Sequence, residues 1–171
     1  MNEGFYVPPL SRAGILKSVR LFRDKLGMKD AIYFDIAFVI EVLAYHLNFF
    51  EFHILEDHEM QGAYAYYNPR NNSLNVSNSV YLSACNGDGR HRFTLAHELA
   101  HWYLHSNKAV LARNTQDTFP KYCDSEWQAN TFASMLLMEP ALIKNMPIEQ
   151  IVERCSVSYQ AATIAKNKVL N

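Results

Sequence analysis

The amino-acid sequence predicts a single α+β domain in which helices pack against an antiparallel sheet of about three strands. Apolar residues recur at helical spacing in several segments, whereas between residues 48 and 78 they alternate with polar residues, as in half-buried strands. A chain of 171 residues with 49% hydrophobic side chains can bury a substantial core but is too short for two domains of ordinary size. Residues 1–171 are therefore expected to form one domain.

The first 47 residues are expected to form an irregular arm and two helices. Two adjacent prolines make residues 1–10 irregular, and Ser11 can cap a helix over residues 12–26 that Gly27 ends. Asp35 precedes a second amphipathic helix, which is suited to cover a sheet. The basic side chains of the first helix are expected to lie mostly on a solvated face; they are Arg12, Lys17, Arg20, Arg23 and Lys25.

Three segments that follow are predicted to be strands. Residues 50–54 alternate between apolar and polar, and residues 63–67 and 73–78 form a hairpin joined by a turn rich in Asn and Pro. Residues 81–89 are rich in Ser, Asn, Asp and Gly, and we interpret them as a loop that leads into a helix starting near residue 90.

That helix carries the pattern His-Glu-x-x-His at residues 97–101. On a helix, His97 and His101 lie one turn apart and point the same way, so two neutral imidazoles can occupy two corners of a tetrahedral Zn²⁺ site. Glu98 can then reach a water molecule at the metal rather than the metal itself. Ordinary helix histidines are the alternative, but the apolar flanks imply burial, and buried imidazoles need partners, which a metal supplies.

A third protein ligand must come from elsewhere in the chain. His105 lies eight residues past the first ligand, about 12 Å along the helix axis, and is too far away to share the ion. Glu126, in the first turn of a second predicted helix, is the better candidate, and Asp124 is its rival; a solvated Glu126 is the alternative. Asn130 follows on the same helix face, where it could orient a ligand. The connection 106–123 is long enough to be a functional loop over the cleft.

Four stretches together resemble the signature of the ImmA/IrrE metallopeptidases. They are Phe93-Thr94-Leu95-Ala96-His97-Glu98-Leu99-Ala100-His101, Leu104-His105, Glu126-x-x-Ala129-Asn130-x-Phe132-Ala133 and Leu136-Leu137-Met138. The resemblance is close over residues 90–140 and looser elsewhere. Ala100 stands where the family most often has Gly, and Glu139 separates Met138 from Pro140 where the family usually has Met-Pro. Neither departure touches a proposed ligand.

The resemblance implies a small gluzincin-like, or zincin-like, fold with the His-Glu-x-x-His segment on a central helix and the metal-binding helices within residues 90–140. It implies that His97, His101 and Glu126 bind Zn²⁺ and that Glu98 is the catalytic acid and base. It also implies a zinc-dependent endopeptidase that acts on a helix-turn-helix transcriptional repressor. We expect such a peptidase to bind its substrate as an added strand along an edge of the predicted hairpin.

Two other functions fit the same residues. The domain could hold zinc and sequester a regulator without cutting it, or it could hydrolyse a substrate other than a peptide. The presence of Glu98 favours hydrolysis, because a purely structural zinc site needs four closed ligands and no base beside an open position.

Composition excludes several other classes of partner. Sixteen basic and 17 acidic side chains give a net charge of −1, so neither nucleic acid nor an anionic membrane is an expected partner. Three cysteines without metal-ligand spacing are expected to be reduced thiols, and Cys123 could be a regulatory thiol. With no apolar run of 18 residues, a cytoplasmic location is expected.

Overall fold

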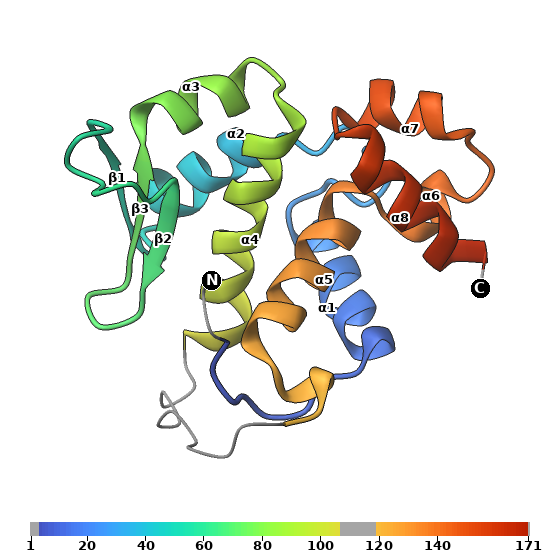
Figure 1. The fold of residues 1–171 in the computed structure, drawn as a ribbon, viewed down its shortest axis with the longest axis horizontal. Coiled ribbons are helices and arrows are strands. Elements are labelled where there is room, and N and C mark those ends of the chain that lie inside the picture. The colour runs from blue at the N-terminus through green and yellow to red at the C-terminus, as the bar shows by residue number, and fades with distance from the viewer. Residues whose placement is uncertain (1–3, 107–118, 171) are drawn as a thin grey trace.

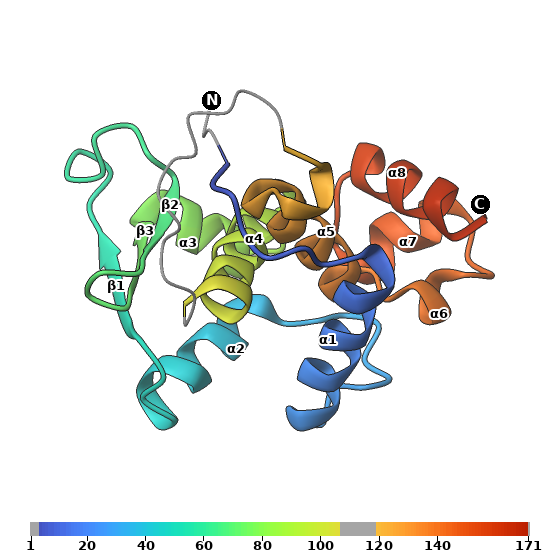
Figure 2. The same cartoon turned by 90° about the horizontal axis from the view of Figure 1, so that it is seen from below.

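The computed structural model describes residues 4–106 and 119–170 and shows a mixed α+β fold (Figures 1 and 2). The helices are α1 (Arg12–Lys25), α2 (Ile36–Glu41), the π-helix η1 (Val42–His46), α3 (Asn78–Cys85), α4 (Gly89–His105), the 3₁₀ turn η2 (Lys121–Cys123), α5 (Ser125–Leu137), α6 (Pro140–Ile143), α7 (Ile148–Cys155) and α8 (Tyr159–Leu170). The strands are β1 (Glu51–Leu55), β2 (Ala65–Asn68) and β3 (Ser73–Ser77). Within the described ranges, no helix combines the length and apolar character needed to cross a membrane.

The sheet is mixed, so the prediction of an antiparallel sheet is wrong for one strand pair. β2 and β3 form the predicted antiparallel hairpin, but β1 pairs with β3 in parallel and the strand order is β1-β3-β2. The chain leaves β1, returns through β2 at the far edge, and then inserts β3 between them in the direction of β1. Alternation of apolar and polar residues reports which face of a strand is buried, and it carries no information on the direction of the neighbouring strand.

The predicted loop 81–89 is also wrong over most of its length, because α3 continues to Cys85. Ser77 caps this helix by accepting a hydrogen bond from the main-chain N–H of Val80. Val80 and Ala84, one turn apart, are each 1% exposed. Their burial against the rest of the fold outweighs the weak helix preference of the Ser and Asn residues around them.

Helix α1 begins at the predicted residue and ends at Lys25, one residue before the predicted end, but its basic face is not uniformly solvated. Arg23 is 1% exposed, and its guanidinium donates hydrogen bonds to the main-chain carbonyl of Leu136, at 2.6 Å, and to that of Ala31. Arg20 Nε donates to Glu139 Oε1 at 2.8 Å. Two side chains expected in solvent therefore connect α1 to the end of α5 and the start of α6, segments more than 100 residues away in the sequence.

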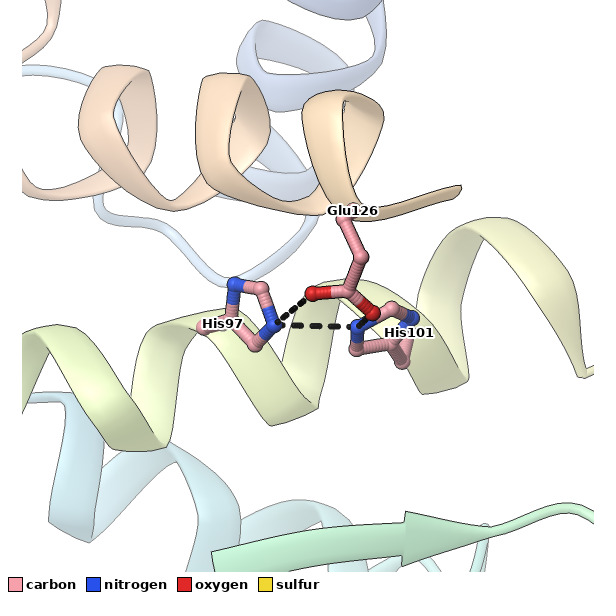
Figure 3. Close-up of side chains that lie close together, drawn as sticks. All are labelled: His97, His101 and Glu126. Atoms are coloured by element: carbon pink, nitrogen blue, oxygen red, sulfur yellow. Dashed lines mark hydrogen bonds and ion pairs between the residues drawn. The ribbon is translucent and has the colours of Figure 1, made fainter. Parts of the chain in front are cut away.

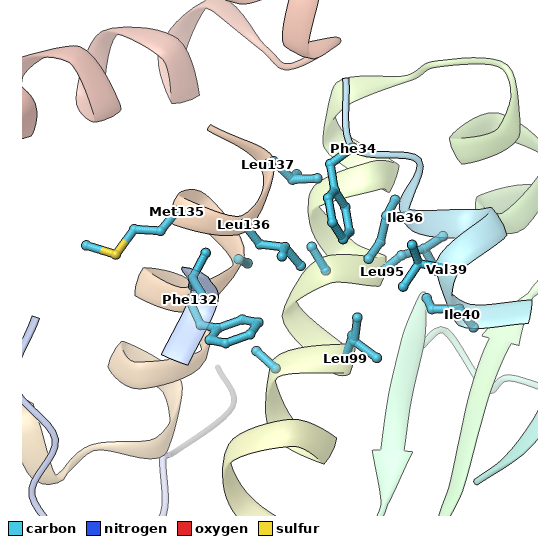
Figure 4. Close-up of a cluster of buried hydrophobic side chains, with 14 of the residues drawn as sticks. Phe34, Ile36, Val39, Ile40, Leu95, Leu99, Phe132, Met135, Leu136 and Leu137 are labelled. Atoms are coloured by element: carbon cyan, nitrogen blue, oxygen red, sulfur yellow. The ribbon is translucent and has the colours of Figure 1, made fainter. Parts of the chain in front are cut away.

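Helices α4 and α5 lie side by side in the two perpendicular views (Figures 1 and 2) and share the hydrophobic core (Figure 4). Ala129 and Ala133, the small residues of α5, are fully buried and allow the close approach that their size predicts. The space around them is filled by larger apolar side chains of both helices: Phe132, Leu136 and Leu137 of α5, and Leu95 and Leu99 of α4. The core thereby fixes the two helices that carry the candidate metal ligands.

The N-terminal arm is irregular, as predicted, but it is attached to the start of α5. Tyr6 forms a β-bridge with Asp124. The main-chain N–H of Val7 donates to Cys123 O at 2.8 Å, and that of Ser125 donates to Phe5 O at 3.0 Å. The arm thus lies against the segment that precedes Glu126. Most of the predicted cleft loop, residues 107–118, lies outside the described residues.

Arg92 connects the start of α4 to the C-terminal helices, and its replacement is expected to destabilise the fold. It is fully buried, and its guanidinium donates to the main-chain carbonyls of Ser156 (3.1 Å), Phe34 (2.8 Å) and Cys155 (3.3 Å). Arg92→Met keeps most of the apolar volume but leaves these acceptors unpaired, so we expect the free energy of unfolding to fall by about 3 kcal/mol in urea titrations.

The matched control is Arg90→Met, two residues earlier on α4. The Arg90 side chain is exposed and packs over the ring of Tyr64, so its loss should cost less than about 1 kcal/mol. Equal losses in the two variants would contradict the role given to the buried guanidinium.

Candidate metal centre

Two helix starts set the positions of the candidate ligands. Asp88 caps α4 by accepting from the main-chain N–H of His91 at 2.9 Å, and the helical period then places His97 and His101, four residues apart, on one side. Asp124 caps α5 by accepting from the main-chain N–H of Glu126 at 2.9 Å, which puts Glu126 in the first turn of α5. The carboxylate of Glu126 points across the gap between the helices toward both imidazoles (Figure 3).

The three side chains predicted as ligands converge on one point. The Nε2 atoms of His97 and His101 are 3.0 Å apart. Glu126 places Oε2 3.2 Å from the first and Oε1 3.2 Å from the second. One ligand atom from each residue lies within 4.8 Å of the other two, and all three side chains are partly buried.

This donor set fits a tetrahedral zinc ion. Zn–N bonds of about 2.0–2.1 Å at tetrahedral angles separate two ligand atoms by about 3.3 Å, close to the separations here. The other imidazole nitrogens are already engaged: Nδ1 of His97 lies 3.0 Å from Asn130 Oδ1, and Nδ1 of His101 lies 3.3 Å from His105 Nδ1. Each histidine therefore has one nitrogen, Nε2, for a metal, and a two-histidine, one-carboxylate set leaves a corner open.

The side chains of the cluster shift one another's pKa values, because the imidazoles and the carboxylate carry opposite charges. Burial alone would lower the pKa of His97, but the hydrogen bond with Glu126 and the charges of Glu98 and Glu126 raise it above the ordinary value. Burial pushes the pKa of Glu126 upward, and hydrogen bonds with His101 and His97 reverse this, so that its pKa lies well below the ordinary value. Glu126 is thus held as a carboxylate whose negative charge attracts a cation.

Glu98 lies beside this cluster and is buried, with 8% of its surface exposed. The main-chain N–H of Tyr67 in β2 donates to Glu98 Oε2 at 2.9 Å. Burial raises the pKa of the Glu98 carboxyl, against the opposing charges of His101 and His97 and the hydrogen bond from Tyr67. A carboxylate with a raised pKa accepts a proton more readily than an ordinary glutamate does.

Strand β2 presents a main-chain edge next to Glu98. It is an edge strand of the described sheet, and it contacts α4. The main-chain N–H of Ser77 donates to Tyr64 O at 3.0 Å, so Tyr64 directs its main-chain groups toward β3. Because main-chain groups alternate along a strand, those of Ala65 and Tyr67 point away from β3. The hydrogen bond from Tyr67 to Glu98 follows from this alternation.

The other residues singled out in the sequence have different places. The carboxylate of Asp124, the rival ligand, is engaged as the helix cap. His105 lies behind His101, on the side opposite Nε2. Asn130 contacts His97, as its register predicts. Cys123 is buried, with 4% of its surface exposed.

Glu139, the departure before Pro140, caps α6 by accepting from the main-chain N–H groups of Ala141 and Leu142. Two site residues had no signal in the sequence. Gln128, on the same helix as Glu126, places its Oε1 3.1 Å from Nε2 of His105. The contact from Tyr67 to Glu98 uses a main-chain N–H, which exists at every position except proline.

Comparison with known proteins identifies the family. The model of the M78 peptidases, described as the IrrE N-terminal-like domain, matches residues 51–165, from β1 into α8. This span contains the converging cluster and Glu98. A search of the curated proteins found no match. Because the matched span covers more than half of the chain, the protein belongs to the M78 peptidases, the ImmA/IrrE family that its motifs resemble.

Proposed function

We propose that the protein is a zinc-dependent endopeptidase. In this proposal His97, His101 and Glu126 hold Zn²⁺, and Glu98 is the catalytic acid and base. The observation that carries it is the convergence of two imidazole nitrogens and a carboxylate next to a buried acid that is not part of the cluster. Three ligands and a free base are the arrangement of a catalytic zinc site rather than a structural one.

In the proposed mechanism the three ligands hold the metal, Glu98 transfers protons, and neighbouring groups orient these side chains. A divalent cation held by the three ligands supplies Lewis acidity toward a scissile carbonyl and a water molecule. Glu98 accepts the proton of the attacking water on a carboxylate oxygen and returns it to the nitrogen of the leaving amine. The main-chain N–H of Tyr67 holds one Glu98 oxygen at 2.9 Å and so orients the other. Asn130 holds the His97 ring through Nδ1, with Nε2 toward the centre.

The edge of β2 is the proposed substrate-binding site. The main-chain groups of Ala65 and Tyr67 point away from β3 on the side of Glu98. An extended peptide could pair with the main-chain groups of Ala65 and with the carbonyl of Tyr67, whose N–H is engaged by Glu98. Such main-chain hydrogen bonds bind a substrate with little demand on its sequence. Tyr64 and Tyr66, 53% and 41% exposed, are available to contact its side chains.

We propose a cytoplasmic helix-turn-helix repressor as the substrate, since the family resemblance implies this partner. Zinc-loaded protein is incubated with a purified helix-turn-helix repressor from the same genome, and the mixture is analysed by intact-mass spectrometry. Two fragments whose masses sum to the repressor plus one water are the expected result. An uncut repressor in a stable stoichiometric complex would instead favour a zinc-containing module that sequesters its regulator.

A further inference from the structure

The side chain of Gln128 in α5 is an amide whose orientation is set by its surroundings. It is fully buried. Its nitrogen lies 2.9 Å from the main-chain oxygen of Pro8 and 2.8 Å from that of Tyr122. Carbonyl oxygens only accept hydrogen bonds, so both contacts require the NH₂ group on this side of the amide. The amide oxygen, Oε1, must therefore face the other way, toward α4.

His105 donates a hydrogen bond to that oxygen. Its Nε2 lies 3.1 Å from Gln128 Oε1, and because this oxygen only accepts, Nε2 carries a hydrogen. A neutral imidazole has one N–H, so Nδ1 of His105 has a lone pair. That lone pair lies 3.3 Å from Nδ1 of His101, which must then be the donor.

The position of the hydrogen on His101 determines which of its nitrogens can bind a metal. In the zinc-loaded protein, a hydrogen on Nδ1 leaves His101 a lone pair on Nε2 for the metal. This Nε2 lies 3.2 Å from Glu126 and 3.0 Å from His97 (Figure 3), and zinc would take the place of the hydrogen that it shares with the Glu126 carboxylate. A metal binds the nitrogen that carries the lone pair, and the hydrogen bond at the other nitrogen sets which one that is.

We propose that Gln128 and His105 are positioning residues that hold His101 in the tautomer required for metal binding, and that the N-terminal arm supports them through the carbonyl of Pro8. This inference rests on the metal site proposed above and assigns it a support outside its ligands. Pro8 precedes the span that the family model matches, so the support reaches beyond that span.

The two histidine ligands differ in how they are supported. The partner of His97 is Asn130, an exposed residue on α5. His101 is supported by a series of contacts that ends in a fully buried amide and two main-chain carbonyls. Loss of a partner of this kind lowers metal affinity by about 10–100-fold.

The tautomers can be observed directly in the zinc-loaded wild-type protein. Long-range ¹H–¹⁵N correlation spectra of the imidazoles are expected to show the hydrogen of His105 on Nε2 and that of His101 on Nδ1. A hydrogen on Nδ1 of His105 would overturn the proposal. This measurement needs no variant and no substrate.

Variants test the same point through the zinc dissociation constant, measured by competition with a chelator. His105→Phe keeps a ring but no acceptor, and Gln128→Met keeps length but no oxygen; each is expected to weaken zinc binding about 10–100-fold. His105→Asn restores an acceptor near the position of Nδ1 and is expected to recover most of the affinity. His53→Phe, at an exposed histidine of β1, is the control and should leave the constant unchanged.

The outcomes separate this inference from the proposed function. Zinc binding that is equally strong in wild type, His105→Phe and Gln128→Met would overturn the positioning role and leave the metal site intact. Wild-type zinc binding in His105→Phe together with weakened binding in His105→Asn would show that the ring only fills space, and this result would overturn the acceptor role of Nδ1. A wild-type protein that binds no zinc would overturn both proposals.

Discussion

Glu98→Gln is expected to reduce peptide hydrolysis about 10²–10⁴-fold while leaving zinc affinity nearly unchanged. The amide keeps an oxygen that can accept from the main-chain N–H of Tyr67, so the side chain should retain its place. It loses the ability to take a proton from water. Glu98 is also not one of the converging ligands, so the metal site should be preserved. Turnover of a partner-derived peptide and the zinc dissociation constant are to be measured on the same preparation.

The control for this variant is Glu153→Gln, an equally conservative change at an exposed position of α7. It should leave both turnover and zinc affinity unchanged. Hydrolysis by Glu98→Gln at the wild-type rate would remove Glu98 from the mechanism. If neither the wild type nor Glu98→Gln cuts the partner and both relieve repression, the sequestering function would be correct.

Glu126→Gln is expected to abolish the stabilisation of the fold by zinc. For a site that binds only the folded chain, zinc at a thousand times its dissociation constant raises the free energy of unfolding by about 4 kcal/mol. The amide preserves the size of the side chain but removes the negative charge that faces His97 and His101 at 3.2 Å. Urea unfolding with and without zinc should therefore show a shift for the wild type and none for the variant.

The same Glu153→Gln protein serves as the control and should keep the full zinc-dependent shift. Addition of a chelator should return the wild type to its metal-free stability. An undiminished shift in Glu126→Gln would exclude this residue as a ligand and would redirect attention to Asp124, the neighbouring carboxylate.

Much of the candidate site was predictable because its geometry is local. His97 and His101 are four residues apart on one helix, and the helical period alone places them on one side. Asn130 follows Glu126 by one turn, so the same period places it on the same face of α5, from which it contacts His97. The sequence made Glu126 the better candidate for the third ligand but left Asp124 as its rival, and the family resemblance implied the pairing of Glu126 with the two histidines, because helical spacing within α4 and α5 does not specify how the two helices meet.

The elements that could not be predicted depend on contacts between distant segments. The direction of β1 relative to β3 depends on the path of the chain between them, which alternation of residue types does not record. Helix α3 exists because Val80 and Ala84 find a buried surface. Arg23 is buried because carbonyls at the end of α5 and near residue 31 accept its hydrogen bonds.

The sequence by itself determined which chemical groups are present and how those within one helix face: two imidazoles one turn apart with an acid between them. Only the tertiary structure decided their surroundings, including the β2 edge at Glu98 and the contacts of Gln128 with His105 and Pro8. The reason is that a hydrogen bond depends on the positions of both partners. Local periodicity supplies the position of a side chain on its own helix, and only packing of the whole chain supplies the position of its partner.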